Sequence, residues 1–477
     1  MTKSTKIVAT IGPATESVEK ITELIKAGMN MARFNTKHGT IEWHQERIAR
    51  VRAIANELDQ PISILLDLQG PEIRITIPGG ETFRVENQDI VTFTSDEGST
   101  NPHKPIVPKI VINSLKPGDH IMIDDGLGEF AVMSQSESEM TTTALGSFPV
   151  ANRKTLNTPG VVIDLPSLIE QDLKQLDATQ SDSIDFVGLS FVRNAQDIAI
   201  LREELTKRNL KAGVVAKIEN QSAIDHLDEI IKVSDAVMVA RGDLAVEVPF
   251  EELTFWQKTI IDKSRALGKP VITATQMLKS MVENPRPTRA EVSDVAHAIY
   301  DGTDAVMLSE ETTIGKFPVE AVAVQATIAE FNEPHAKFQP IENQLDSVCA
   351  YITQSAIELL KSINSNQMET HLHKIICLTE TGGTAQLAAR FRPDLPIHAL
   401  TSNQRTYRKL SIVYGVTPHM ISLPEGDKLE SSENLIKQLL TLKIAEPGEE
   451  VLLIHGTFWK KPGLTNTLTL LTIPVTK

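Results

Sequence analysis

The chain has 477 residues, enough for two to four domains, which excludes a single small binding module. Its 47 Lys and Arg residues are outnumbered by 62 Asp and Glu residues, giving a net charge of −15. This charge argues against general binding to nucleic acid or to anionic membranes, because both present negative phosphates. The two cysteines, Cys349 and Cys377, are too few for a disulfide framework, so we expect a reducing, cytoplasmic compartment.

Short apolar runs alternate with helix-like stretches through the first two thirds of the chain. Continuous apolar character is typical of parallel strands buried on both faces, and helices between such strands indicate right-handed βαβ units. The eight runs are residues 6–11, 29–34, 62–67, 185–191, 213–219, 236–240, 270–275 and 304–309. Eight such units predict an α/β fold, a (β/α)₈ or TIM barrel.

More than a hundred residues separate the third and fourth runs, which is far longer than a normal crossover. Residues 71–158 change to alternating pieces rich in Thr, Val and Ile, with turn signals such as Pro78-Gly79-Gly80. We therefore predict a small β-barrel lid domain over 71–158, inserted on a hinge into a barrel formed by residues 1–70 and 159–334. After the insert, Ser167 and Glu170 have capping-box spacing, which predicts that a helix resumes there.

Residues 335–477 begin a new pattern. A helical stretch at 345–363 is followed by an apolar run at 374–378, a Thr/Gly loop, a helix from Ala385 and further runs at 397–400, 451–454 and 467–472. This order predicts a separate C-terminal α/β domain.

Polar residues gather where the predicted barrel strands end. Residues two apart on a strand point to one face, and a barrel's active site lies at the carboxyl ends of its strands. The polar residues at these ends are Arg33, Asn35 and Lys37; Asp67 and Gln69; Lys217 and Glu219; Asp243; Thr273 and Thr275; and Ser309 and Glu311. One such pair is ordinary, but pairs at five strand ends predict an active site.

The residue types indicate the chemistry. Glu219 and Asp243 are oxygen ligands suited to Mg²⁺, which also binds substrate phosphate. Lys217 and Arg33 can neutralise the charge of a transferring phosphoryl group or an enolate. The turn from Gly242 to Asp243 opens a predicted helix, and its backbone N–H groups could hold a carboxylate. A small phosphorylated carboxylate is the expected ligand.

Several motifs resemble the pyruvate kinase family, and the resemblance covers nearly the whole chain. They are TKIVATIGPA at 5–14, DLQGPEIR at 67–74, AKIEN at 216–220, MVARGDL at 238–244, ITATQML at 272–278 and PTRAEVSDVA at 287–296. The resemblance implies a barrel with a mobile β lid, a C-terminal α/β domain and usually a homotetramer. It also implies transfer of the phosphoryl group of phosphoenolpyruvate to ADP, giving pyruvate and ATP in the last step of glycolysis.

The resemblance implies a role for each matching residue. Lys217 resembles the lysine that stabilises the phosphoryl group and the enolate, and Glu219 and Asp243 resemble the ligands of Mg²⁺ or Mn²⁺. Arg33 matches the arginine on the substrate phosphate. Thr275 matches the threonine that helps to protonate the enolate with water.

Further roles follow by the same matching. Ser309 and Glu311 extend a proton path to Thr275. The substrate carboxylate is assigned to the turn formed by Ala240, Arg241, Gly242 and Asp243. The nucleotide side is assigned to Asn35, His38 and Arg74, and a monovalent-cation site to Asn35, Lys37, Asp67 and Leu68.

The chain departs from the family pattern at Lys37, where a serine usually helps to bind K⁺. An ammonium group near Asp67 and Glu72 would supply that positive charge, and two cations about 4 Å apart would repel by several kcal/mol at an effective dielectric constant of ~20. We therefore expect no K⁺ requirement. The alternative is that Lys37 turns to solvent or reaches the nucleotide phosphates. Gln69, Asn194 and Glu310 are further departures.

In the C-terminal domain a turn between a strand and a helix has the composition of a phosphate-binding loop. The resemblance implies that a sugar phosphate binds there as an allosteric effector, helped by residues 459–463. The residues of the turn are Thr379, Thr381, Gly382, Gly383 and Thr384, and Glu380 among them would repel phosphate. A plain structural turn is the alternative.

Two other functions fit parts of this pattern. A Mg²⁺-dependent lyase acting on an enolate would use the same Lys, Glu and Asp residues but would need no nucleotide. A non-catalytic paralogue that binds metabolites would explain the departures at Lys37, Gln69 and Asn194. The intact residues Lys217, Glu219, Asp243 and Thr275 argue against it.

Overall fold

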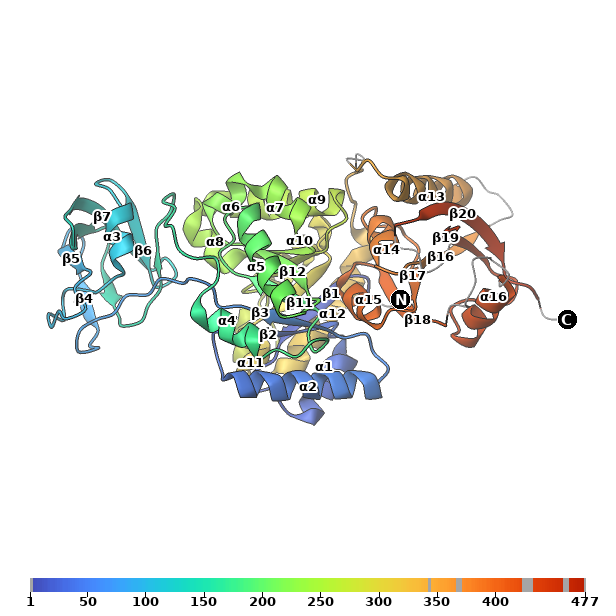
Figure 1. Ribbon diagram of the computed structural model, residues 1–477, viewed down its shortest axis with the longest axis horizontal. Helices are drawn as coiled ribbons and strands as arrows, with labels where there is room; N and C mark the ends of the chain where they lie inside the picture. The colour runs from blue at the N-terminus through green and yellow to red at the C-terminus, as the bar shows by residue number, and fades with distance from the viewer. Residues whose placement is uncertain (1–2, 342–344, 366–370, 423–431, 458–462, 476–477) are drawn as a thin grey trace.

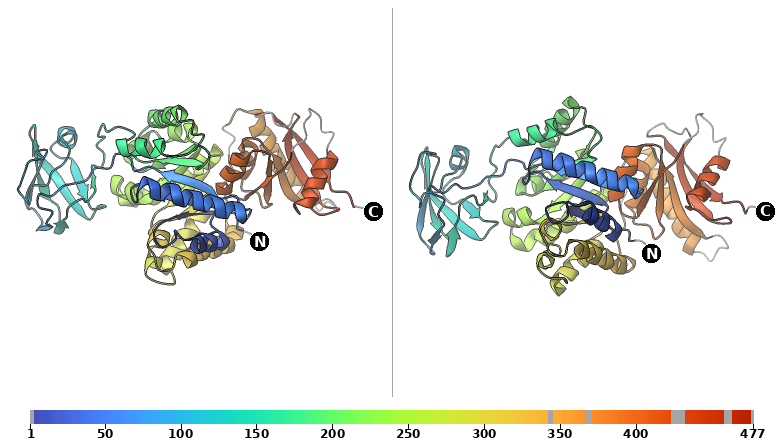
Figure 2. Two further views of the ribbon diagram at one scale, coloured as in Figure 1. Left: turned by 60° about the horizontal axis from the view of Figure 1, so that its bottom comes forward. Right: turned by 90° about the horizontal axis from the view of Figure 1, so that it is seen from below.

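A computed structural model describes residues 3–341, 345–365, 371–422, 432–457 and 463–475. Three bodies lie in a row along the long axis of the molecule (Figure 1). A small β domain is at one end, the barrel is in the centre and an α/β domain is at the other end. Two further views show the β domain standing off the barrel on two connecting segments (Figure 2).

Eight parallel strands close into the central barrel. Their order, β1-β15-β14-β13-β12-β11-β3-β2, follows the chain once the insert between β3 and β11 is set aside. The strands are β1 (Lys6–Thr10), β2 (Met31–Asn35), β3 (Ser63–Asp67), β11 (Phe186–Leu189), β12 (Gly213–Ile218), β13 (Ala236–Ala240), β14 (Val271–Ala274) and β15 (Ala305–Leu308). Each overlaps one of the eight predicted runs, so the predicted (β/α)₈ barrel is confirmed.

The barrel interior is a packed core rather than a channel. Side chains such as Val8, Met31, Leu65, Met238 and Ile272 are buried together inside it. The opposite faces of the strands are buried under the surrounding helices. Burial on both faces explains why these strands have continuous apolar sequences.

Five of the helices around the barrel, α1, α2, α5, α6 and α10, begin at a residue whose side chain caps the helix. Ser17 caps α1 by accepting a hydrogen bond from the Lys20 N–H, and Gly28 ends that helix with a φ of 117°. The helices are α1 (Val18–Ala27), α2 (Ile41–Glu57), α4 (Glu170–Asp177), α5 (Ala195–Lys207), α6 (Gln221–Asp225), α7 (Leu227–Val233), α8 (Arg241–Glu247), α9 (Leu253–Ala266), α10 (Arg289–Asp301), α11 (Glu310–Thr313) and α12 (Pro318–Asn332), with 3₁₀ turns η1 (Phe250–Glu252), η2 (Lys279–Val282) and η3 (Glu333–His335).

The predicted capping box at Ser167 and Glu170 is wrong. Ile169 precedes α4, and its N–H donates to Asp172. The Ser167 hydroxyl donates instead to Asp197. Asp172 also accepts hydrogen bonds from the N–H groups of residues 69 and 70, so its buried carboxylate anchors the segment that leads into the insert.

The inserted segment folds into a five-stranded antiparallel sheet, order β10-β6-β7-β8-β5, and a two-stranded ribbon, β4-β9. It has its own apolar core, in which Phe130 packs against Phe93 and Phe148. Its elements are β4 (Phe83–Val85), β5 (Ile90–Thr94), α3 (Lys109–Ser114), β6 (His120–Ile123), β7 (Gly128–Gln135), β8 (Glu139–Ala144), β9 (Phe148–Val150) and β10 (Leu156–Asn157). The positive φ of Gly70, 69°, suits the glycine at the entry to this segment.

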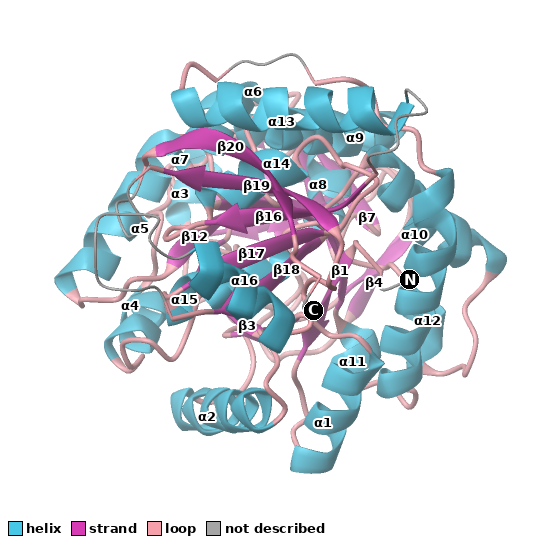
Figure 3. Cartoon of the chain, turned by 90° about the vertical axis from the view of Figure 1, so that its right-hand side faces the viewer, coloured by secondary structure: helices cyan, strands magenta, loops and turns pink. Residues whose placement is uncertain are grey.

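The C-terminal domain is a five-stranded sheet, order β18-β17-β16-β19-β20, with helices against it (Figure 3). Its elements are α13 (Val348–Ser365), β16 (Leu372–Leu378), α14 (Gly383–Ala389), β17 (Ile397–Thr401), α15 (Gln404–Lys409), η4 (Leu410–Ile412), β18 (Val416–Met420), α16 (Ser432–Thr441), β19 (Glu450–Gly456) and β20 (Thr465–Thr472). The sequence reading missed β18, an edge strand that contains Pro418, a residue confined to such positions in sheets. Within the described ranges no helix is both long enough and apolar enough to cross a membrane.

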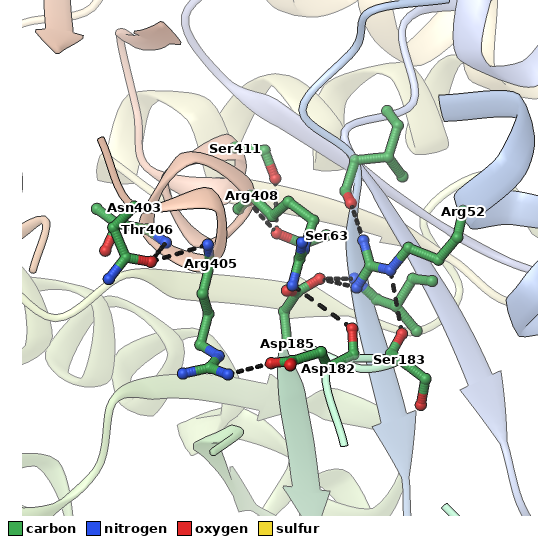
Figure 4. Close-up of polar contacts among 12 residues, drawn as sticks. Arg52, Ser63, Asp182, Ser183, Asp185, Asn403, Arg405, Thr406, Arg408 and Ser411 are labelled. Atoms are coloured by element: carbon green, nitrogen blue, oxygen red, sulfur yellow. Dashed lines mark hydrogen bonds and ion pairs between the residues drawn. The ribbon is translucent and has the colours of Figure 1, made fainter. Parts of the chain in front are cut away.

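A polar network joins the barrel to the C-terminal domain at the amino ends of the barrel strands (Figure 4). Asp185, fully buried before β11, accepts hydrogen bonds from Arg52 of the barrel and from Arg408 of α15, the latter at 2.8 Å. Ser63, at the start of β3, donates to the Arg408 carbonyl oxygen at 2.6 Å. Arg405 of α15 forms an ion pair with Asp182. Helix α15 is therefore fastened to the starts of β3 and β11.

We predict that Asp185→Ala destabilises the protein by about 3–5 kcal/mol, because it leaves two largely buried guanidinium groups without their shared carboxylate. The measurement is the midpoint of thermal unfolding, which should fall by several degrees. Asp177→Ala is the control, since Asp177 is exposed and pairs with Arg208 at the surface. Equal shifts for both variants would contradict the assignment of Asp185 as the central contact of this junction.

Candidate active site

The carboxyl ends of the barrel strands open into a cavity of about 1400 Å³ that the inserted β domain partly covers. From the barrel it is lined by residues that include Asp243, Thr275 and Ser309, and from the β domain by residues that include His120 and Asp125. The cavity therefore lies where a barrel enzyme has its active site.

Lys217 lies at the centre of the polar cluster. Its Nζ is 2.8 Å from Glu219 Oε1, 3.4 Å from Asp67 Oδ1 and 2.7 Å from Ser190 Oγ, to which it donates a hydrogen bond. Burial lowers the pKa of Lys217, but the Asp67 and Glu219 carboxylates outweigh it and raise the pKa above its usual range. Lys217 is thus a permanent cation held in a fixed position.

Arg33, at the end of β2, forms the second part of the cluster. Its Nε and Nη2 each lie 2.7 Å from Asp67 Oδ2, and its Nη1 donates to the Thr10 hydroxyl at 3.0 Å. Burial favours the protonated form of Asp67, yet Lys217 and Arg33 hold the pKa of this carboxyl below its usual value. Asp67 is therefore an ionised, buried carboxylate shared by two cations.

Glu219 and Asp243 form an acidic pair whose negative charge the chain does not fully compensate. Glu219 is buried and accepts a hydrogen bond from the Phe191 N–H at 2.7 Å. Burial, together with the neighbouring Glu219 charge, raises the pKa of Asp243 to about 7. A divalent cation would relieve this unfavourable charge, so the pair fits a metal ion. Among the described residues no group of three or more His, Cys, Asp or Glu side chains could hold a metal. Mg²⁺ is commonly held by one or two carboxylates, with water or substrate phosphate in its other positions.

The turn after β13 and the turn after β14 are tied together. The Gly242 N–H donates to the Thr275 hydroxyl at 2.8 Å. The Arg241 guanidinium reaches across to the end of β14, where it binds both Asp294 oxygens and the backbone carbonyls of Ala274 and Thr275. Thr275 has a φ of 71°, a strained conformation for a β-branched residue. Arg241 therefore holds Thr275 in place.

Glu311 braces the same turn from the other side. Its two carboxylate oxygens accept hydrogen bonds from the N–H groups of Leu278, at 3.0 Å, and Ser309, at 2.8 Å. Glu310 pairs with Lys279 at the edge of the cavity. This contact gives Glu310 a partner that the sequence reading did not identify.

Lys37 points to Glu72, at the base of the inserted domain. Its Nζ lies 2.7 Å from Glu72 Oε1, and Arg74 Nε lies 2.9 Å from Glu72 Oε2. His38 is an exposed residue beside this group, and partial desolvation and the Lys37 cation lower its pKa. Lys37 is thus an exposed residue whose ammonium group is paired with Glu72.

The oxygens assigned to the monovalent-cation site mostly have partners within the chain, although Asp67 Oδ1 is buried without a hydrogen bond and lies 3.4 Å from Lys217 Nζ. Asn35 Oδ1 accepts the Lys37 N–H at 3.1 Å. Asp67 is shared by Arg33 and Lys217, and the Leu68 carbonyl oxygen accepts the Ser190 hydroxyl at 2.7 Å. Ser190 follows β11 directly, so its place at a strand end was the signal that the sequence reading overlooked.

Two other predicted positions have mainly local contacts. Asn194 caps α5 by accepting hydrogen bonds from the N–H groups of residues 196 and 197. In the C-terminal domain the Thr379 hydroxyl accepts the Gly382 N–H at 2.9 Å, and the Thr384 and Thr465 hydroxyls are 2.7 Å apart. Thr381 is exposed, Gly383 opens α14, and Glu380 Oε2 accepts the Ser402 hydroxyl. Residues 459–462 lie outside the described part of the chain.

The fold and this cluster define a class of protein. Buried cations and metal-type carboxylates at the carboxyl ends of a parallel barrel are suited to stabilising negative charge on a phosphorylated substrate. Such a site belongs to an enzyme of phosphoryl transfer or enolate chemistry.

Comparison with known proteins identifies the family. A model described as the barrel domain of pyruvate kinase matches residues 2–322, and one described as the pyruvate kinase alpha/beta domain matches residues 358–471. The chain therefore belongs to the pyruvate kinase family of phosphotransferases.

Individual relatives agree with this assignment. A pyruvate kinase of Bacillus licheniformis is 39% identical over 471 residues, which cover 98% of this chain and 80% of the relative. One of Staphylococcus aureus strain MRSA252 is 42% identical over 419 residues, covering 87% and 71%. The crystal structure of a pyruvate kinase from Cryptosporidium parvum superposes with a TM-score of 0.88 at 30% identity, covering 99% of this chain and 96% of that one.

Proposed function

We propose that this protein transfers the phosphoryl group of phosphoenolpyruvate to ADP, giving pyruvate and ATP as the last step of glycolysis. The observation that carries the proposal is the placement of Lys217 between Asp67 and Glu219, where its charge is fixed before substrate arrives. Phosphoryl transfer depends on such preorganised positive charge.

The reaction moves the phosphoryl group from the enol oxygen of phosphoenolpyruvate to a terminal phosphate oxygen of ADP. Arg33 and Lys217 bind the phosphoryl group and oppose the charge that develops on the enolate oxygen. The enolate then takes a proton at C3, through water held by Thr275, and becomes pyruvate. Ser309 extends the proton path that begins at Thr275, and Glu311 holds Ser309 in position.

The remaining contacts divide between the two substrates and the metal. The substrate carboxylate binds at the turn of residues 240–243, and the nucleotide binds on the side of Asn35, His38 and Arg74. Glu219 and Asp243 would hold Mg²⁺ or Mn²⁺, which supplies charge neutralisation at the phosphoryl group.

We also propose that activity does not require K⁺. The support is that Lys37 pairs with Glu72 and that the oxygens of Asn35, Asp67 and Leu68 already accept hydrogen bonds or ion pairs within the chain.

Regulation and assembly complete the proposal. A sugar phosphate binds as an allosteric effector at the turn of residues 379–384, supported by the backbone N–H groups where α14 begins. The protein works as a cytoplasmic homotetramer, with residues 71–158 acting as a lid on the barrel of 1–70 and 159–334.

A steady-state coupled assay tests the function. Pyruvate release that requires both ADP and phosphoenolpyruvate supports the proposal. Pyruvate release without ADP would indicate a lyase, and binding without turnover would indicate a non-catalytic paralogue. Running the assay with and without candidate sugar phosphates tests the effector in the same experiment.

We predict that Lys217→Met lowers kcat by about 10³ or more while the affinity for phosphoenolpyruvate changes little, because the lost cation acts mainly on charge that develops in the transition state. Steady-state kinetics and substrate-binding titration measure the two effects. Lys174→Met is the control, since Lys174 is an exposed residue of α4 that pairs with Glu170. Wild-type turnover by Lys217→Met would refute the role.

Glu219→Gln and Asp243→Asn should each raise the Mg²⁺ concentration needed for half-maximal activity by tenfold or more, because each removes a charged ligand worth about 1–2 kcal/mol of metal binding. Metal titration of activity gives this value, and removal of the metal with EDTA should abolish turnover. Glu247→Gln is the control, because Glu247 is a carboxylate of the same cavity that bonds to Asn157. Unchanged titrations in both variants would place the metal elsewhere.

The wild-type enzyme should be nearly independent of K⁺, and Lys37→Ser should either acquire a K⁺ requirement or lose most activity without K⁺, because the ammonium charge is lost. The assay compares K⁺ with an inert organic cation at constant ionic strength. Lys279→Ser is the matched control, a lysine of the same cavity whose partner is Glu310. Strong, saturable activation of the wild type by K⁺ would overturn this proposal.

A further inference from the structure

The carboxylate of Asp172 is buried at the start of α4, beside the two segments that connect the barrel to the inserted domain. Its Oδ1 accepts the Gln69 N–H at 3.0 Å, and its Oδ2 accepts the Ile169 N–H at 3.1 Å. The Gly70 N–H is shared between the two oxygens, at 3.4 and 3.3 Å. Gln69 and Gly70 lie on the outgoing connection and Ile169 follows the returning one, so one carboxylate holds both.

These contacts show that the Asp172 side chain is ionised. Both of its oxygens accept hydrogen bonds from N–H groups, so a proton on either oxygen would face another donor. Burial raises the pKa of Asp172, and the hydrogen bonds from these backbone groups lower it. A buried carboxylate is costly unless it is paired or hydrogen-bonded, and here backbone N–H groups supply the hydrogen bonds.

The peptide group between Leu68 and Gln69 extends this contact toward the candidate active site. Its N–H donates to Asp172, and its carbonyl oxygen, that of Leu68, accepts the Ser190 hydroxyl at 2.7 Å. The Ser190 oxygen in turn accepts the Lys217 ammonium group at 2.7 Å. An unbroken chain of hydrogen bonds, here called the Lys217 relay, therefore runs from Lys217 through Ser190 and this peptide group to Asp172.

Every donor in the Lys217 relay points in the same direction, away from the Lys217 ammonium group and toward the Asp172 carboxylate. Hydrogen bonds aligned in this way polarise one another, and those that involve an ionised group are the strongest. Ser190 is 3% exposed and Asp172 is 0% exposed, so little water competes for these bonds. The relay thus places a cation at one end and an anion at the other.

Packing couples the turn at Gly70 to the end of β11. The φ of Gly70 is 69°, and a Cβ added there would lie 2.9 Å from Ser190 Cβ and 3.2 Å from Phe191 Cδ2. The Phe191 N–H donates to Glu219 at 2.7 Å. A displacement of this turn would therefore press on the two residues that hold Lys217 and Glu219.

We propose that Asp172 is a positioning residue for phosphoryl transfer, which fixes the direction of the Lys217 ammonium group through the Lys217 relay. This inference rests on the proposed function, because that function gives Lys217 its role at the transferring phosphoryl group. Asp172 itself does not touch the substrate. It holds the peptide group so that the Ser190 hydroxyl donates to the Leu68 carbonyl oxygen and turns a lone pair toward Lys217.

The first experiment is a double-mutant cycle on kcat with Asp172→Asn and Ser190→Ala in the full chain. Each single variant should lower kcat by about tenfold or more, because each breaks a buried bond of the relay. The KM for phosphoenolpyruvate should change by less than about threefold. Because both variants act through one relay, the double variant should be about as slow as the slower single variant, whereas independent effects would multiply.

The second experiment measures hydrogen exchange at the Gln69 amide and needs no turnover. Exchange should become about tenfold faster in Asp172→Asn, which removes the acceptor of that amide, and about threefold faster in Ser190→Ala, which acts on it only through the peptide group. If the wild type releases no pyruvate, the proposed function fails, and this measurement still tests the relay. It also decides the matter with Ser190→Ala alone if Asp172→Asn fails to fold.

Matched controls come from exposed positions of the same region. Asp177→Asn changes a carboxylate at the end of α4 that pairs with Arg208 at the surface. Ser181→Ala removes an exposed hydroxyl that donates to the Asn209 carbonyl oxygen. Both controls should leave kcat and the exchange of the Gln69 amide unchanged.

Three results would overturn the proposal. One is a wild-type kcat in folded Asp172→Asn. Another is a double variant whose loss of kcat equals the product of the two single losses, which would make the roles of Asp172 and Ser190 independent. The third is an exchange rate at the Gln69 amide that Ser190→Ala leaves unchanged, which would make Asp172 a local structural contact only.

Discussion

The ammonium group of Lys217 lies between the carboxylates of Asp67 and Glu219, and this arrangement constrains the whole candidate site. Two buried carboxylates so close together would repel unless a cation separates them. The barrel provides the geometry, because β3 and β12 flank β11, so that Asp67 and Lys217 approach each other across the end of that strand. The strand between them contributes Ser190, which accepts a hydrogen bond from the Lys217 ammonium group and fixes its direction.

The position of Lys217 therefore depends on how β11 is held at both ends. At its start, Asp185 joins Arg52 of the barrel to Arg408 of the C-terminal domain (Figure 4). At its end, Ser190 and the Phe191 N–H contact the active-site cluster. Strand β11 has four residues, and these contacts fix both of its ends. A fixed strand suits a site that acts through preorganised charge.

The sequence predicted the barrel and the residues at its strand ends, because both depend on strong local signals. Continuous apolar runs reveal strands buried on both faces, and polar residues just after them reveal the mouth of the barrel. The direction of side chains was not predictable in this way. Arg241 binds Asp294, a residue distant in sequence. At the start of α4 the acceptor is Asp172 and not Ser167 or Glu170, and this choice depends on side-chain rotamers. Strand β18 was missed because Pro418 interrupts its pattern.

Charge balance relates the two ends of the barrel. At the carboxyl ends, Asp67 and Glu72 are paired with cations of the chain. The negative charge that remains uncompensated is that of Asp243, beside Glu219. An external cation is the natural way to correct it. At the amino ends the buried charges are paired within the chain instead, Arg392 with Asp304 at 2.9 Å and Arg408 with Asp185 at 2.8 Å. A fold that buries charge at both ends of one barrel thus leaves a place for a cation where chemistry occurs and pairs its charges where the domains are joined.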